Sequence, residues 1–239
     1  MENTKKMASL TGMAATVAGV AGFFLRMSLY GAAVDHKGML VTWHPLTVCL
    51  VLAGLVSAVV TLTLAFRLPG KSKCSGPSGV LSGVGSILMA LGLVLGLAAE
   101  RKTGLSMPVL VLAGAAAAAM VLAAVAQFRG RQPYFLCHAL VSLFMAALLI
   151  GKYQVWRQTP QLMDFAPALL AVVMMMLYSF QLAQASLSQG SPRSLLSFGG
   201  LGIFLCLTAL SGGEPMWLYL GGAGWMITGL LAGPREGQA

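Results

Sequence analysis

The charged residues that could bind a solute lie near the ends of long apolar runs. Arg26 and Lys152 are each placed about one helical turn inside the end of such a run. Asp35, Glu100 and Asp164 lie at polar breaks between runs. At one membrane surface these five side chains could line an outer vestibule that captures a charged or zwitterionic solute. The alternative is that the two long basic side chains snorkel to the interface and form ion pairs at its rim.

Ionisable side chains are absent from the middle of every long apolar run. Such groups usually mark proton relays or ion sites, so their absence argues against a proton pump and a carboxylate-coupled symporter. We expect the neutral polar side chains that remain to hydrogen-bond backbone carbonyls or neighbouring helices. They are Thr16, Ser57, Thr61, Ser86, Ser142, Tyr178, Thr208 and Thr228.

A serine motif precedes a glycine-rich apolar run. Gly76-Pro77-Ser78-Gly79, followed by Gly83, resembles the GxSG motif of rhomboid intramembrane proteases. The resemblance implies that Ser78 is the nucleophile and that His138, two predicted helices later, is the general base that a serine hydroxyl needs. It covers only these residues, and the family's HxxxN segment is missing from the chain.

The sequence offers no spacing suited to metal or cofactor chemistry. His44 and His138 begin predicted helices on opposite faces of the membrane, so one haem iron cannot join them. No Walker loop, HExxH or dinucleotide fingerprint occurs. We expect no metal and no cofactor. The four cysteines form no CxxC pair and are predicted to be buried and reduced: Cys49, Cys74, Cys137 and Cys206.

The composition indicates which solvent surrounds most of the chain. Of the 239 residues, 58% are hydrophobic and only 9% are charged, with a mean hydropathy of +0.84. Because a soluble domain carries about a quarter of its residues as charged side chains, we predict a lipid bilayer as the main partner. The net charge of +9 then favours anionic headgroups over nucleic acid.

One group of basic residues lies in the breaks predicted to face the cytoplasm. These side chains could bind lipid headgroups, and the alternative is that they serve only as topology determinants. They are Arg67, Lys71, Lys73, Arg129 and Arg131.

Eight runs have about the 20 apolar residues that a helix needs to cross the hydrocarbon core. They cover residues 8–30, 45–66, 79–99, 106–128, 134–156, 165–186, 195–211 and 216–232. Their apolar character is continuous, whereas strands of a membrane barrel would alternate. We therefore predict an all-α polytopic transmembrane bundle forming a single domain over residues 1–239, with seven spanning helices as the alternative. Halves of four helices each, 1–130 and 131–239, are a further hypothesis.

The distribution of Lys and Arg predicts the orientation. With the N-terminus inside, nine of these residues fall in inner segments and six in outer segments. Because basic residues favour the inner side, we expect both termini in the cytoplasm and the bundle in the cell membrane. The first run is long enough to span, which favours an uncleaved helix over a signal peptide.

Small residues predict close helix contacts in the run 79–99. Gly79 and Gly83, then Gly92 and Gly96, have the spacing that lets helix backbones approach. Packing within the bundle is the first interpretation, and homo-oligomerisation is the second.

Three function classes follow from these patterns. The first is a carrier for a small solute or a lipid. The second is a non-catalytic subunit or scaffold that packs against a membrane partner. The third is the rhomboid-like protease.

Overall fold

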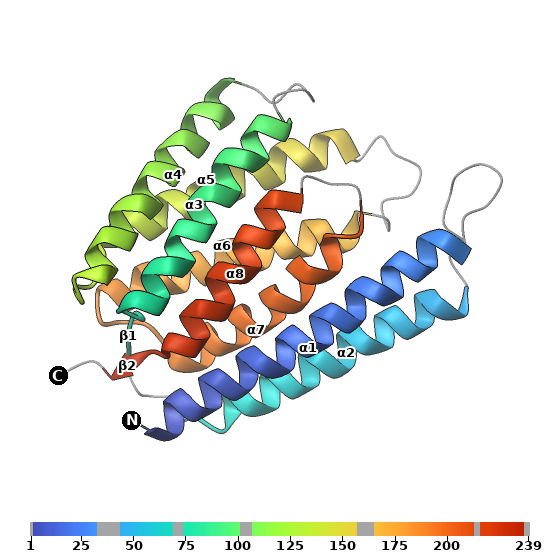
Figure 1. The fold of residues 1–239 in the computed structure, drawn as a ribbon, viewed down its shortest axis with the longest axis horizontal. Helices are drawn as coiled ribbons and strands as arrows, with labels where there is room; N and C mark the ends of the chain where they lie inside the picture. Colours follow the sequence, from blue (N-terminus) through green and yellow to red (C-terminus); the bar gives the residue numbers. More distant parts are fainter. Residues whose placement is uncertain are drawn as a thin grey trace.

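Helices make up nearly all of the chain that the structure describes. The computed structural model describes residues 2–32, 44–68, 74–100, 107–156, 165–212 and 216–236. Within these ranges lie eight helices and two short strands (Figure 1). They are α1 (Glu2–Ala32), α2 (Pro45–Phe66), β1 (Cys74–Ser75), α3 (Val80–Glu100), α4 (Met107–Phe128), α5 (Phe135–Trp156), α6 (Ala166–Ser186), α7 (Pro192–Ala209), α8 (Met216–Ala232) and β2 (Arg235–Glu236). The predicted all-α bundle is confirmed.

Six helices begin and end within one residue of the predicted runs, and two differ more. Helix α1 begins at Glu2, because its polar first turns continue the helix outside the apolar run. At 31 residues it is about 46 Å long, which exceeds the hydrocarbon core. Helix α7 begins at Pro192 because proline, which lacks an amide hydrogen, is well tolerated in the first turn.

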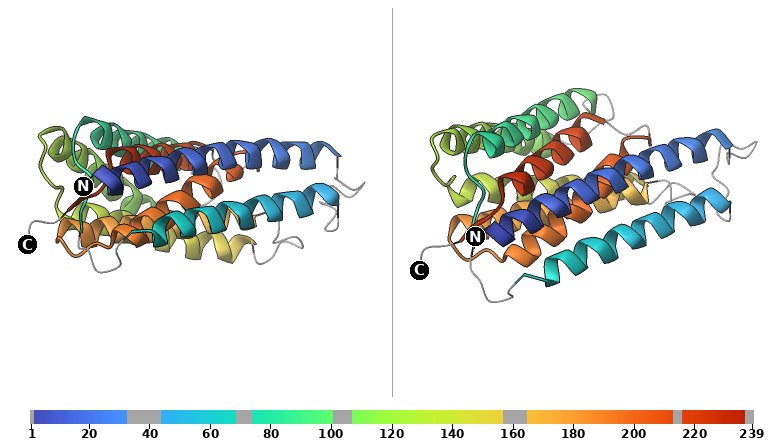
Figure 2. Two further views of the ribbon diagram at one scale, coloured as in Figure 1. Left: turned by 90° about the horizontal axis from the view of Figure 1, so that it is seen from below. Right: turned by 60° about the horizontal axis from the view of Figure 1, so that its bottom comes forward.

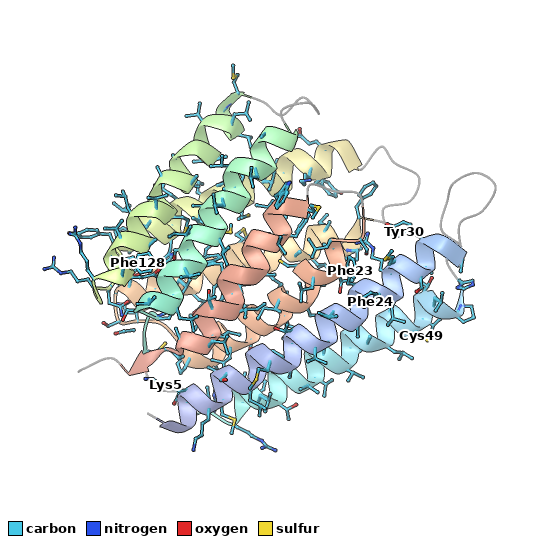
Figure 3. The ribbon with its side chains drawn as sticks, viewed as in Figure 1. Lys5, Phe23, Phe24, Tyr30, Cys49 and Phe128 are labelled. Carbon is cyan, nitrogen blue, oxygen red and sulfur yellow. The ribbon has the colours of Figure 1, made fainter. Side chains whose placement is uncertain are left out.

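Six helices are long and apolar enough to cross a membrane, namely α1, α2, α4, α5, α6 and α7. Helices α3 and α8 carry shorter apolar stretches. The outward faces bear large apolar side chains, and α2 is the extreme case, with only Ser57, Thr61 and Ala65 buried. Cys49 lies on its outer side and is exposed, so the prediction that all four cysteines are buried is wrong for this one (Figure 3). Because exposing so large an apolar surface to water is unfavourable, these helices belong in a bilayer.

Helices α3 to α8 form a closed ring. Each packs against the next in sequence, and α8 packs back against α3. Helix α1 lies outside this ring against α7 and α8, and α2 lies against α1 and α7 (Figures 1 and 2). Because α3 and α8 come from different predicted halves, the halves are not separate in space, and an internal repeat stays a prediction.

Glycines bring α3 and α8 into close contact. A Cβ added to Gly92 would lie 2.7 Å from the carbonyl oxygen of Trp217, and one added to Gly221 would lie 2.7 Å from that of Leu88. These distances leave no room for a side chain on either helix. The predicted small-residue face of α3 is therefore buried within the chain.

The two termini lie at the same end of the bundle, which we call the terminal end (Figure 1). Here β1 pairs with β2 in an antiparallel register, with Cys74 opposite Glu236 and Ser75 opposite Arg235. The amide of Cys74 also donates to the carbonyl of Gly190, between α6 and α7, at 2.9 Å. Three segments far apart in sequence are thereby joined at this end.

Candidate functional site

Arg26, a predicted vestibule residue, is buried at the opposite end of the bundle, where it contacts the end of α7. It is 3% exposed. Its Nη1 donates to the carbonyl of Thr208 at 3.2 Å, and its Nη2 donates to the hydroxyl of Tyr30 at 3.1 Å. A Cβ added to Gly212 would lie 2.7 Å from Nη2. The guanidinium thus stabilises the carbonyl end of α7, where the helix dipole favours a cation.

Among the other predicted vestibule residues, only Lys152 has a described side chain, and no packed pair of helices brings it against Arg26. Lys152 is buried in the last turns of α5, which packs against α4 and α6, whereas α1 packs against α2, α7 and α8. Asp35, Asp164 and the side chain of Glu100 lie outside the described residues. The outer vestibule therefore stays a prediction.

Exposed basic side chains gather at the terminal end. Arg67, Arg129 and Arg131 are exposed there, whereas Lys71 and Lys73 lie outside the described residues. Lys5 and Lys6 are exposed at the start of α1, and Figure 3 places Lys5 beside the end of α8. Headgroup binding by these residues stays a prediction.

Ser78 and His138 do not form the hydrogen bond that the rhomboid resemblance requires. The Ser78 Oγ is buried and has no hydrogen-bond partner among the described residues, and the same holds for His138 Nδ1. The imidazole is 1% exposed and stacks on the indole of Trp225, with 6.1 Å between ring centroids. Pro77, next to Ser78, lies near Gly229 of α8, and His138 lies on Trp225 of the same helix.

One buried region of the bundle is organised around Trp225 in the middle of α8. The ring of Tyr178 meets the indole edge-to-face, at 5.0 Å between centroids, while His138 stacks on it. Gly229 lies one turn further along α8, and a Cβ there would be 2.3 Å from the Tyr178 hydroxyl and 3.9 Å from Pro77. A glycine is therefore required at this position for the phenol to enter the space between α6 and α8.

An extended segment, residues 74–79, covers this region at the terminal end; we call it the strap. Its Gly76 carbonyl accepts a hydrogen bond from Gln132 Nε2 at 2.8 Å, and its Gly79 amide donates to the Gln127 carbonyl at 3.1 Å. Gly76 and Pro77 are buried. With β1 bound to β2 and Gly190, the strap is held by α4, by the turn between α6 and α7, and by the C-terminal strand.

Buried polar atoms without a hydrogen-bond partner collect beneath and along the strap. We call the residues that carry them the polar cluster: Ser78 (Oγ), Gln132 (Oε1), His138 (Nδ1), Tyr178 (OH) and Gln181 (Oε1). Gln181 follows Tyr178 by three residues on α6 and so lies on the same face of the helix. Buried polar atoms are normally paired, so five without partners in one region indicate a place where water or a ligand completes the hydrogen bonds.

Several neutral polar side chains behave as predicted. Thr16, Thr208 and Thr228 donate to carbonyls four residues earlier in their own helices. Ser86 donates to Gln127 Oε1 on the neighbouring helix at 2.7 Å. For Ser57 and Tyr178 the prediction is wrong, because neither buried hydroxyl has a hydrogen-bond partner among the described residues. The Tyr178 hydroxyl lies in the narrow space opposite Gly229.

Three glutamines around this site were not among the residues predicted from the sequence. Gln127 and Gln181 lie within predicted spans, and Gln132 lies just after one. A glutamine side-chain amide in an apolar segment is destabilising unless it is hydrogen-bonded. A glutamine within a predicted span is therefore a signal that could have identified these residues.

The fold and the cluster together define a membrane helical bundle with a group of buried polar side chains inside it. Comparison with protein-family models, curated proteins and solved structures gives no match to this chain.

Proposed function

We propose that this protein is a carrier for a small, uncharged solute and that the polar cluster is its binding site. The observation that supports this proposal is the group of five buried polar atoms without partners inside a membrane bundle. Leaving such an atom unpaired destabilises a protein by about 1–3 kcal/mol. Retention of these destabilising unpaired atoms is explained if, in a solute-bound state, the solute supplies their hydrogen-bond partners.

The strap gives the cluster a cover that can open. Several of its contacts are single hydrogen bonds to separate elements, such as those of Gly76 and Gly79. Opening it would expose the cluster to the terminal side, and the glycine contact between α3 and α8 allows those helices to shift against each other. A scaffold needs neither a polar interior nor a removable cover, which favours the carrier over the subunit.

We assign the terminal end to the cytoplasm in this proposal. All the described Lys and Arg side chains that are exposed lie at that end, and basic residues favour the inner face of a cell membrane. Tyr134 and Phe128 are exposed there, while Tyr153 and Trp217 are exposed at the opposite end. Aromatic side chains at both ends are typical of the two interfaces of a spanning bundle.

The proposal is tested by the accessibility of the cluster from each side of the membrane. A Tyr178→Cys variant is prepared with Cys49 replaced by serine, and is treated with a membrane-impermeant thiol reagent in right-side-out and inside-out vesicles. We expect reaction from both sides, because a carrier exposes its site alternately. Met145→Cys is the matched control, since Met145 on α5 is as buried as Tyr178 but carries no polar atom of the cluster, and it should stay unreactive.

Two outcomes would contradict the carrier. If Tyr178→Cys reacts from neither side, the cluster is a static part of the core, as in a scaffold. If it reacts from one side only, the cluster is a one-sided pocket.

A further inference from the structure

We infer that the polar cluster accepts an uncharged solute that carries several hydroxyl groups. This inference rests on the carrier proposed above and specifies the chemistry of its site. It follows from the charge, the donor and acceptor pattern, and the aromatic walls of the cluster.

The described contacts of the cluster favour an uncharged ligand. The residues that contact it include Gly76, Pro77, Gly199, Trp225 and Gly229, and none of these five carries a charge. An ion taken into such an apolar, buried place without a counter-charge would lose its hydration and gain no ion pair.

The pattern of donors and acceptors calls for hydroxyl groups. The Gln132 amide is oriented by its bond from Nε2 to the Gly76 carbonyl, so its Oε1 is left to accept. The Oε1 of Gln181 also accepts only, whereas the hydroxyls of Ser78 and Tyr178 can both donate and accept. One hydroxyl of a polyol can donate to an amide oxygen and accept from a serine or tyrosine at the same time.

The aromatic rings supply the remaining surface. His138 and Tyr178 contact Trp225 from two directions, so ring faces and edges border the unpaired polar atoms. Small-molecule sites are mostly apolar walls with a few placed polar groups, and the C–H groups of a polyol suit such walls.

The test is ligand-dependent thermal unfolding of the detergent-purified protein. The probes are erythritol, sorbitol and glucose, with choline and glycerol 3-phosphate as charged controls of similar size. Polyols stabilise any protein at high concentration because they are excluded from its surface, so the shift must saturate with concentration. We expect a saturable rise in Tm with at least one of the three polyols and none with the charged compounds.

Two variants separate binding from general stabilisation. Tyr178→Phe removes one hydroxyl from the cluster and should weaken the apparent Kd about tenfold, as expected for one lost hydrogen bond. Tyr153→Phe is the matched control, because Tyr153 is exposed on α5, and it should leave the Kd unchanged.

Three results overturn the inference. A saturable shift with a charged probe contradicts an uncharged ligand. An equal Kd in wild type and Tyr178→Phe contradicts binding at the cluster. No saturable shift in Tm with any polyol would mean that water alone fills the site. If Tyr178→Cys is still labelled from both sides of the membrane in that case, the carrier proposal stands and only the proposed ligand class is wrong.

Discussion

The Arg26 contact at the opposite end and the polar cluster at the terminal end both bury polar groups, but in different ways. Arg26 meets the Thr208 carbonyl and the Tyr30 hydroxyl, and it closes the end of α7. The cluster buries polar atoms whose partners are missing from the described structure. A buried group with its partners in place supports the fold, whereas a set of buried groups that lack them indicates a site.

The largest expected effect on stability comes from removing the Arg26 guanidinium, which has its hydrogen-bond partners in place. Arg26→Met should lower the free energy of unfolding by about 3 kcal/mol, since hydrogen bonds from a buried charged group contribute about 1.5–3 kcal/mol. Denaturation in detergent, followed by circular dichroism, measures this change. Arg129→Met, at an exposed arginine, is the control and should change stability by no more than about 0.5 kcal/mol. Equal effects would mean that Arg26 does not stabilise the end of α7.

The glycine contact between α3 and α8 should be the next most sensitive feature. Gly92→Ala should destabilise the bundle by about 2 kcal/mol, because its methyl group would overlap the backbone of α8. Gly114→Ala is the matched control on α4, where a Cβ meets nothing within 4 Å. That variant should be neutral or stabilising by up to about 1 kcal/mol through helix propensity. Thermal unfolding compares the two, and similar Tm values would contradict the close approach of α3 and α8.

The conformation of the strap depends on Gly79, whose φ is +115°. Gly79→Ala should cost about 1–2 kcal/mol from backbone strain alone, because a Cβ there also meets nothing within 4 Å. Gly31→Ala, in the last turn of α1 with equally open space, provides the control and should not destabilise. Chemical denaturation of both variants tests this, and an unperturbed Gly79→Ala would mean that the strap is not held in this conformation.

The smallest expected effects differ in sign between the two regions. Tyr30→Phe should destabilise by about 1 kcal/mol, because it removes a hydrogen bond to Arg26. Tyr178→Phe should be neutral or stabilising by up to about 1 kcal/mol without ligand, because it removes a hydroxyl that lacks a partner. Unfolding curves of Tyr30→Phe and Tyr178→Phe compare the loss of the same hydroxyl group beside Arg26 and in the polar cluster. A loss of stability in Tyr178→Phe would show that its hydroxyl is paired in the protein.

Most of the fold could be predicted from the sequence because apolar length determines it. The run 45–66 matches α2 at both ends, where His44 Nδ1 accepts the Leu46 amide and Pro45 begins the helix. The polar cluster could not be predicted in the same way. Its members come from the strap, the segment before α5, and helices α5 and α6, and only the packing of the ring brings them together. From the sequence, Ser78 and His138 stand out together through the rhomboid resemblance, and Tyr178 stands out separately as a neutral polar side chain in an apolar run.

The central claim is tested most directly by locking the strap. In a Glu236→Cys variant, the new cysteine is the register partner of the native Cys74 across the two antiparallel strands, a pairing that places Cβ atoms about 4.5–5.5 Å apart and so favours a disulfide. Burial raises the pKa of the Cys74 thiol to about 11, so an added oxidant is needed at neutral pH. Tyr178→Cys is combined with this pair and with Cys49→Ser, and labelling at residue 178 itself is followed from each side before oxidation, after oxidation and after reduction.

The carrier predicts that oxidation abolishes labelling from the terminal side and leaves labelling from the opposite side intact, and that reduction restores the labelling from the terminal side. Cys74→Ser in the same background is the control, because it cannot form the disulfide and should be insensitive to the oxidant. Labelling that continues from the terminal side with the strap locked would contradict the account.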